Sequence, residues 1–245
     1  MYQNVIFDLD GTLLNTLEDL KDSTNYALAQ HSYPTRTLEE VRCFVGNGIR
    51  KLIDRAVPEG TSVEKTDKVF ATFREYYATH SRVKTSMYEG MEQVMDALKE
   101  QNISMAIVSN KADDAVKDLA KYYFAKYIDV AIGEREGISR KPAPDSVYEA
   151  MRLLGATKEN TVYVGDSDVD RATAKNAGIP CISVTWGFRS EELLVSLEPE
   201  YLIYDVQPVE GAFFPVDPVS VKIKKSENID FRVTPCLSIH PNRIE

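Results

Sequence analysis

Short apolar segments alternate with longer amphipathic segments along most of the chain. The short segments, several of them rich in β-branched residues, predict buried strands at Asn4–Phe7, Ile103–Val108, Val130–Ile132, Thr161–Val164, Cys181–Val184 and Tyr201–Tyr204. Between most of them, apolar residues recur with helical spacing, as in Met91–Leu98, Val116–Tyr123 and Val147–Leu154. This alternation predicts an α/β fold with a doubly wound, Rossmann-like parallel sheet.

The segment between the first two predicted strands breaks this alternation, because it is mainly helical and charged. Its first helix is expected to start at Thr16, where Thr16 and Asp19 have the spacing of a capping box, and more helices are expected from Leu38 to about His80. The predicted organisation is a core of residues 1–15 and 85–208, a helical domain of residues 16–84 inserted into it, and a proline-containing C-terminal extension of residues 209–245 that could form a β-hairpin.

Polar residues that could take part in catalysis or ligand binding follow several of the predicted strands. In a parallel sheet, ligands bind outside the carboxyl ends of the strands, so these residues are expected to share one site. They are Asp8, Asp10 and Gly11 after the first strand, Ser109 and Asn110 after the second, Lys141 in a proline-rich loop, and Asp166 and Asp170 after the fourth.

Each of these signals also has a purely structural explanation. An Asp-Gly turn after a strand is common, Ser and Asn often cap helices, a loop lysine is usually solvated, and acidic residues are favoured at helix N-termini. Their combination is more informative. A cluster of carboxylates at one sheet edge would repel itself and any phosphate, and a divalent ion with oxygen ligands would remove both problems.

The set Asp8-x-Asp10-Gly11-Thr12, Ser109-Asn110, Lys141 and Gly165-Asp166-Ser167-x-x-Asp170 resembles the four motifs of the haloacid dehalogenase-like (HAD) superfamily in order and spacing. The resemblance extends from Asn4 to about Tyr204. The insertion is similar to the helical cap of the subgroup that includes phosphoglycolate phosphatases. A phosphatase that acts on a small phosphomonoester is therefore expected.

The resemblance implies a role for each motif residue. Asp8 is the nucleophile that carries the phosphoryl group, and Asp10 is the general acid and base. Mg²⁺ is held by Asp8, the Asp10 carbonyl oxygen and Asp166, with Asp170 supporting the metal. The remaining motif groups bind the phosphoryl oxygens: Lys141, Ser109, Asn110 and the backbone N–H near Leu9.

The inserted domain is expected to recognise the substrate. Gly46, Asn47 and Gly48 resemble the loop with which the caps of phosphoglycolate phosphatases close over the site, and Arg50 could meet a substrate carboxylate. A helix-connecting turn with a solvated basic face would explain the same residues. Phosphoglycolate is the leading candidate substrate by resemblance.

Composition limits the other classes of function. A net charge of −9 argues against a nucleic-acid partner, and no apolar run reaches membrane-spanning length. The chain passes from Met1 straight into a short strand-like segment, so a signal peptide is not expected. We expect a cytoplasmic protein that is a monomer or a homodimer.

Four alternatives remain open at this stage. A sugar-phosphate mutase or a pyrophosphatase could use the same scaffold, although the first inserted helix lacks a histidine that would serve a mutase. A phosphoacceptor module of receiver type would be shorter and would carry its aspartate on a later strand. A silent binding protein would be expected to have lost a motif residue, and none is missing here.

Overall fold

A six-stranded parallel sheet forms the centre of the computed structural model, which describes residues 2–206. Its strand order is β5-β4-β1-β6-β7-β8, with every neighbouring pair parallel. The strands are β1 (Asn4–Phe7), β4 (Ser104–Ala112), β5 (Val130–Glu134), β6 (Thr161–Gly165), β7 (Cys181–Val184) and β8 (Tyr201–Ile203). Each predicted strand has its counterpart, and the predicted doubly wound sheet is confirmed.

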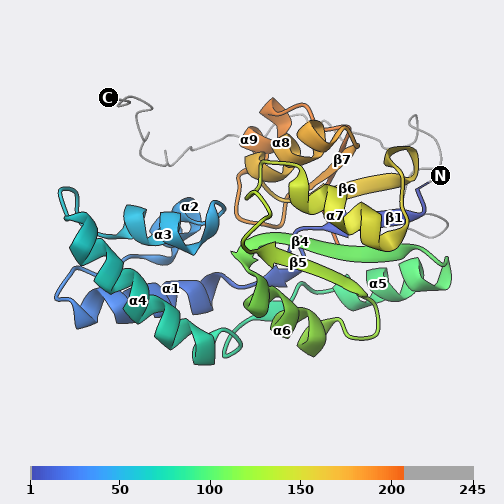
Figure 1. Ribbon diagram of the computed structural model, residues 1–245. Coiled ribbons are helices and arrows are strands. Elements are labelled where there is room, and N and C mark those ends of the chain that lie inside the picture. The colour runs from blue at the N-terminus through green and yellow to red at the C-terminus, as the bar shows by residue number, and fades with distance from the viewer. Residues whose placement is uncertain (1, 207–245) are drawn as a thin grey trace.

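Helices cover both faces of this sheet (Figure 1). The alternation of β1 side chains explains how. Val5 and Phe7 pack with apolar residues of α5 (Met91–Glu100) and α6 (Asp113–Tyr123), whereas Ile6 points to the other face, against α7 (Asp145–Leu154) and α8 (Asp168–Ala177). The fully buried β1 therefore lies at the centre of a three-layer core. A short 3₁₀ helix (Lys158–Asn160) and α9 (Glu191–Ser196) complete the described elements of the core.

The inserted segment forms a separate group of helices to one side of the sheet (Figure 1). These are α1 (Leu17–Gln30), α2 (Leu38–Phe44), α3 (Gly48–Ala56) and α4 (Val63–His80). Their buried residues, among them Leu28, Ile53 and Phe73, form a hydrophobic cluster distinct from the two that cover the sheet. We call these helices and their connections the cap.

Two linkers join the cap to the core, and a small antiparallel pair of β2 (Leu14–Asn15) and β3 (Ser86–Met87) ties them together. The Thr16–Asp19 capping box predicted at this point is wrong. Thr16 precedes α1 with φ −100° and ψ 1°, and its side chain makes no capping hydrogen bond. The buried Asp19 carboxylate instead accepts hydrogen bonds from the backbone N–H of Lys84 at 2.9 Å and from the N–H and hydroxyl of Thr85, both at 2.8 Å. Asp19 thus fastens the second linker to the first cap helix.

The predicted C-terminal extension and its possible hairpin lie outside the described residues. Within residues 2–206, no helix is long and apolar enough to cross a lipid bilayer.

Candidate active site

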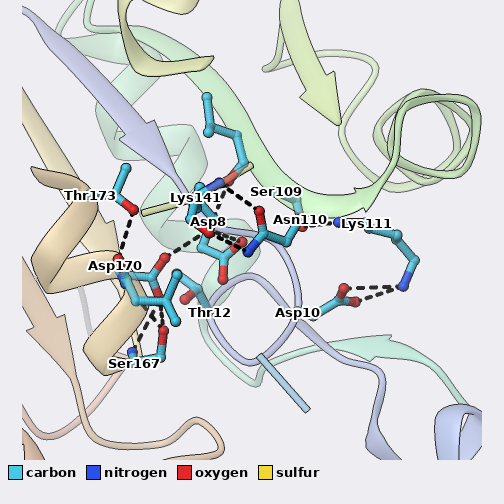
Figure 2. Close-up of polar contacts among 12 residues, drawn as sticks. Asp8, Asp10, Thr12, Ser109, Asn110, Lys111, Lys141, Ser167, Asp170 and Thr173 are labelled. Carbon is cyan, nitrogen blue, oxygen red and sulfur yellow. Dashed lines mark hydrogen bonds and ion pairs between the residues drawn. The ribbon is translucent and has the colours of Figure 1, made fainter. Parts of the chain in front are cut away.

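The motif residues from four parts of the sequence meet at the carboxyl ends of the central strands (Figure 2). Asp8 directly follows β1, and Ser109 and Asn110 lie near the end of β4. Lys141 lies in the loop before α7, Asp166 directly follows β6, and Asp170 lies in the first turn of α8. The sequence-based expectation that these groups share one edge of the sheet agrees with the structure.

Lys141 is the centre of the buried polar network. Its ammonium group lies 2.9 Å from Asp8 Oδ1 and 2.8 Å from Asp170 Oδ1, and it donates to the Tyr163 hydroxyl at 3.0 Å. Only 3% of the Lys141 side chain is exposed. Burial alone would lower the pKa of this amine, but the carboxylates of Asp170 and Asp8 hold that pKa well above its usual range. Lys141 therefore carries a fixed positive charge beside the Asp8 carboxylate.

Asn110 holds Lys141 in place through its backbone. The Asn110 side-chain amide donates to the carbonyl oxygen of Lys141 at 3.1 Å and accepts from its N–H at 2.9 Å. The helix-cap explanation of Ser109 and Asn110 does not hold, because β4 continues through both residues and Ala112 is the residue that precedes α6. The Ser109 hydroxyl lies at the cavity wall and accepts from the N–H of Lys111 at 3.3 Å.

Asp8, Asp166 and Asp170 form a compact acidic group. Each offers a carboxylate oxygen within 4.8 Å of the others, so the three could hold a metal ion. Burial and then the charge of Asp170 raise the pKa of Asp8 to about 8 and that of Asp166 to about 7. The pKa values show that these carboxylates are costly to ionise in the absence of a cation.

The Asp166 carboxylate is oriented by hydrogen bonds to both of its oxygens. Thr12 Oγ donates to one oxygen at 3.0 Å, and the backbone N–H of Phe188 donates to the other at 2.8 Å. Gly11 is required beside it, because its φ is +91° and an added Cβ would lie 2.5 Å from Asp166 Oδ2. The Asp-Gly turn after β1 therefore leaves space for an acidic side chain from β6.

The charges of the buried groups fit a divalent oxygen-ligated cation. The site contains four carboxylates, from Asp8, Asp10, Asp166 and Asp170, and the two ammonium groups of Lys111 and Lys141, which leaves a formal charge of about −2 if all are ionised. Oxygen donors of this kind are the ligands that Mg²⁺ prefers.

The Asp10 carboxylate points away from the acidic group and pairs with Lys111 (Figure 2). Lys111 Nζ lies 3.0 and 3.1 Å from the two Asp10 oxygens and donates to the Tyr77 hydroxyl of α4 at 2.8 Å. Sequence reasoning missed both Lys111 and Tyr77. Lys111 could have been noticed as the residue after Ser109-Asn110, but no sequence signal connects it with a tyrosine of the cap.

A cavity of about 40 Å³ separates the cap from the core motifs. It has room for only a few water molecules. Core groups on one side include Asp8, Asp10 and the two lysines. Cap residues form the other side: Leu20, Val45, Gly46, Gly48, Ile49 and Leu52. Cap residues therefore lie over the core motifs in this structure, and the cap wall is largely apolar.

The predicted cap residues have different places around this cavity. Gly46 and Gly48 line it, and the Gly46 carbonyl oxygen accepts from the Asn110 amide at 3.4 Å. Asn47 lies beside them, with its side-chain oxygen accepting from Arg55 at 2.8 Å. Arg50 pairs with Asp54 and Asp67 and lines a neighbouring cleft instead of the cavity. The structure does not bring Arg50 to the motif residues.

A loop of the core docks the cap from the opposite side. Arg189 donates to the Val45 carbonyl oxygen at 2.7 Å, and Arg42 of α2 donates in return to the Phe188 carbonyl oxygen at 2.5 Å. The Phe188 side chain is buried in the hydrophobic cluster of the cap. Because the Phe188 N–H also orients Asp166, one core residue contacts both the cap and the acidic group.

Comparison with known proteins agrees with this geometry. The family described as haloacid dehalogenase-like hydrolase matches residues 5–184, which include all four motifs. The chain belongs to the haloacid dehalogenase-like hydrolase family. It is 32% identical over 205 residues to Phosphoglycolate phosphatase 1 of Pseudomonas aeruginosa, covering 81% of this chain and 75% of that protein. It is 31% identical over 202 residues to Pyrophosphatase PpaX of Halalkalibacterium halodurans, covering 81% and 91% of the two chains.

Solved structures share the arrangement of core and cap. A protein from Lactobacillus delbrueckii subsp. bulgaricus has 33% identity and a TM-score of 0.80, over 84% of this chain and 95% of that one. A predicted phosphoglycolate phosphatase from Haemophilus somnus has 26% identity and a TM-score of 0.78 over the same shares. This HAD hydrolase is thus a phosphatase, similar to phosphoglycolate phosphatases and to pyrophosphatases.

Proposed function

We propose that the protein is a Mg²⁺-dependent hydrolase of small phosphate monoesters, with phosphoglycolate as the best candidate substrate, and that it works through an aspartyl-phosphate on Asp8. The observation that supports this most directly is the position of Asp8. Its carboxylate lies 2.9 Å from the buried Lys141 ammonium, beside Asp166 and Asp170, and Asp8 lines the cavity between cap and core. The first motif then provides a second carboxylate, Asp10, which lines the same cavity.

In the first step a carboxylate oxygen of Asp8 attacks the phosphorus atom. The bond from phosphorus to the ester oxygen breaks, its electron pair stays on that oxygen, and Asp10 gives the oxygen a proton. Lys141 stabilises the negative charge of the phosphoryl oxygens, together with the Ser109 hydroxyl and the Asn110 amide. Lys141 is held by buried partners, so its charge needs no rearrangement during the step.

In the second step water attacks the aspartyl-phosphate. Asp10 takes a proton from the water, the bond from phosphorus to the Asp8 oxygen breaks, and phosphate and a free carboxylate remain. When bound by Asp8, Asp166 and the Asp10 carbonyl oxygen, with Asp170 in support, Mg²⁺ supplies positive charge that offsets the charge of the phosphoryl group. Both predicted roles of Asp10 depend on a carboxylate at the leaving-group side.

Similarity to the named relatives favours a small, anionic leaving group. The cap wall, which lies across the cavity from Asp8 and Asp10, offers a substrate few polar groups. Among the residues that line the cavity, Lys111 is the cation on the Asp10 side, and its ammonium group is already paired with the Asp10 carboxylate. The named relatives act on phosphoglycolate and on pyrophosphate, whose leaving groups are both anions.

Pyrophosphate hydrolysis is the second candidate, supported by the similarity to Pyrophosphatase PpaX. A mutase is less well supported, because α1 contains no histidine and His31, just after it, bonds to Thr72 within the cap. A receiver-type phosphoacceptor would lack a cap, and a silent binding protein has no explanation for the intact set of buried motif residues.

Phosphate release from a panel of substrates tests this proposal. The panel contains phosphoglycolate, pyrophosphate, a sugar phosphate and a nucleotide, each with Mg²⁺ and with excess chelator. We expect release to require the metal and to be fastest with phosphoglycolate. Faster release from pyrophosphate would favour the second candidate, sugar-phosphate isomerisation without release would favour a mutase, and inertness toward the whole panel would contradict the proposed function.

A further inference from the structure

Lys111 is a buried cation that the proposed chemistry does not yet use. Only 1% of its side chain is exposed, and it belongs to β4 of the core. Its three ammonium hydrogens match three acceptor oxygens within 3.1 Å: both carboxylate oxygens of Asp10 and the hydroxyl of Tyr77. Burying an ammonium group is unfavourable in free energy unless the charge is paired, so Lys111 depends on these three partners to remain charged in the interior.

The three partners come from separate parts of the fold. Asp10 follows β1, Lys111 lies on β4, and Tyr77 lies on the cap helix α4. Tyr77 is itself only 3% exposed, and its ring lies against the Lys111 ammonium, with 4.8 Å between Nζ and the ring centroid. The contact between Lys111 and Tyr77 therefore crosses from the core to the cap, and it can exist only while the cap lies on the core.

A general acid must be held within reach of the proton that it transfers. The Asp10 side chain is 16% exposed at the cavity, and within residues 2–206 Lys111 is the only side chain that its carboxylate hydrogen-bonds to, so Lys111 sets its orientation. Free rotation of the carboxylate would remove it from the leaving-group oxygen for part of each turnover.

We propose that Lys111 is a positioning residue that orients the Asp10 carboxylate for proton transfer, and that Tyr77 fixes Lys111 in this role when the cap closes. This inference rests on the proposed phosphatase function. It makes acid and base catalysis depend on cap closure, because opening the cap removes the Tyr77 hydroxyl from Lys111 while the Lys111–Asp10 pair stays within the core.

The decisive test uses two substrates whose leaving groups differ in their need for a proton. The alkoxide of an alkyl phosphate such as phosphoglycolate must be protonated as it leaves, whereas nitrophenolate leaves p-nitrophenyl phosphate without a proton. Water attack on the aspartyl-phosphate needs the base with either substrate. kcat, KM and the pre-steady-state release of nitrophenolate are measured for the wild type and for Lys111→Met, Lys111→Arg and Tyr77→Phe.

With phosphoglycolate, we expect Lys111→Met to lower kcat by roughly 100-fold, within the range that general acid-base catalysis contributes, and to change KM much less. With p-nitrophenyl phosphate, the same variant should show a burst of nitrophenolate close to one per enzyme, because only the second step is slowed. Tyr77→Phe should lower kcat for phosphoglycolate by about 2–10-fold, as expected for one hydrogen bond. Lys111→Arg, which keeps the charge, should recover part of the lost activity.

Controls come from equivalent groups on the surface. Lys121→Met and Tyr122→Phe change an exposed lysine and an exposed tyrosine of α6, and both should retain wild-type rates. A double variant, Asp10→Asn with Lys111→Met, should be no slower than Asp10→Asn alone, because Lys111 acts through Asp10.

Three results would overturn the assignment. They are equal losses on both substrates without a burst, rates within about threefold of the wild type for Lys111→Met, and a double variant that loses the product of the two single effects. Wild-type protein that is inert toward both substrates would remove the proposed function itself, and with it this role of Lys111.

Discussion

Replacing Asp166 with Asn should separate two effects on the stability of the folded protein. One is the repulsion among the buried carboxylates, and the other is the stabilisation that a bound metal ion provides. Asp166 is 2% exposed, and Asn has nearly the same shape, so its oxygen can accept from the Phe188 N–H at 2.8 Å while its NH2 group donates to the Thr12 hydroxyl oxygen at 3.0 Å. It also removes one of three carboxylates that repel one another within 4.8 Å. Without metal, we expect the Asp166→Asn protein to unfold at the same temperature as the wild type or higher.

Addition of Mg²⁺ should reverse this order. A ligand present at 100 times its Kd stabilises the folded state by about 2.7 kcal/mol. For a chain of this size, each kcal/mol raises the melting temperature by about 2–4 °C, so the wild type should gain roughly 5–10 °C. The variant, which lacks a ligand and one negative charge, should gain far less.

Thermal unfolding followed by circular dichroism, with Mg²⁺ or with chelator, measures both effects. Asp168→Asn is the matched control, since Asp168 lies two residues away on the same turn, its side chain is 49% exposed, and it pairs with Arg189 on the surface. The control should keep the full response to Mg²⁺. An Asp166→Asn protein that gains as much from Mg²⁺ as the wild type would refute the metal assignment, and a marked loss of stability without metal would refute the repulsion argument.

Three further changes test other parts of the structure. Asp8→Asn should abolish turnover and acid-stable labelling by a ³²P-labelled substrate without altering the melting temperature by more than a few degrees, and retained turnover would exclude Asp8 as nucleophile. Asp19→Asn should lower the free energy of unfolding by about 2–4 kcal/mol in urea titrations, because hydrogen bonds from Thr85 and its neighbour to a buried charge are weakened; an unchanged midpoint would show that the linker does not depend on them. Gly48→Ala should reduce kcat/KM more than Gly60→Ala. Both glycines have φ +80°, so they share the same backbone strain, but an added Cβ meets a backbone oxygen of the core at 3.2 Å at Gly48 and open space at Gly60. Equal activities of the two variants would contradict close docking of the cap.

The sheet and the motif cluster could be predicted because both are properties of strands. The apolar runs that form β1 and β6 are buried on both faces, so their hydrophobic pattern alone identifies them. Parallel strands then bring their carboxyl ends together, which is why Asp8, Lys141 and Asp166 could be expected in one place before their distances were known.

Contacts between the cap and the core could not be predicted in the same way. The capping box predicted at Asp19 is absent because Lys84 and Thr85, 65 and 66 residues away, offer the carboxylate two backbone N–H groups and a hydroxyl. The local sequence spacing contains no information about these donors. Lys111 and Tyr77 were missed for the same reason, since they are 34 residues apart and meet only when the cap lies on the core. Arg50 was expected at the substrate, but two nearby carboxylates, Asp54 and Asp67, hold it on the outside of the cap.

The double role of Phe188 sets a rule for exchanging caps between relatives. Its side chain packs in the hydrophobic cluster of the cap, while its N–H orients the Asp166 carboxylate. A chimera that receives only residues 16–84 from another family member would therefore place a foreign cap on a native Phe188, and poor packing there would be transmitted to the acidic group. Transplanting residues 186–189 from the same donor keeps the packing between this loop and the cap matched. The segment that must be exchanged to transfer substrate specificity therefore includes a loop of the core.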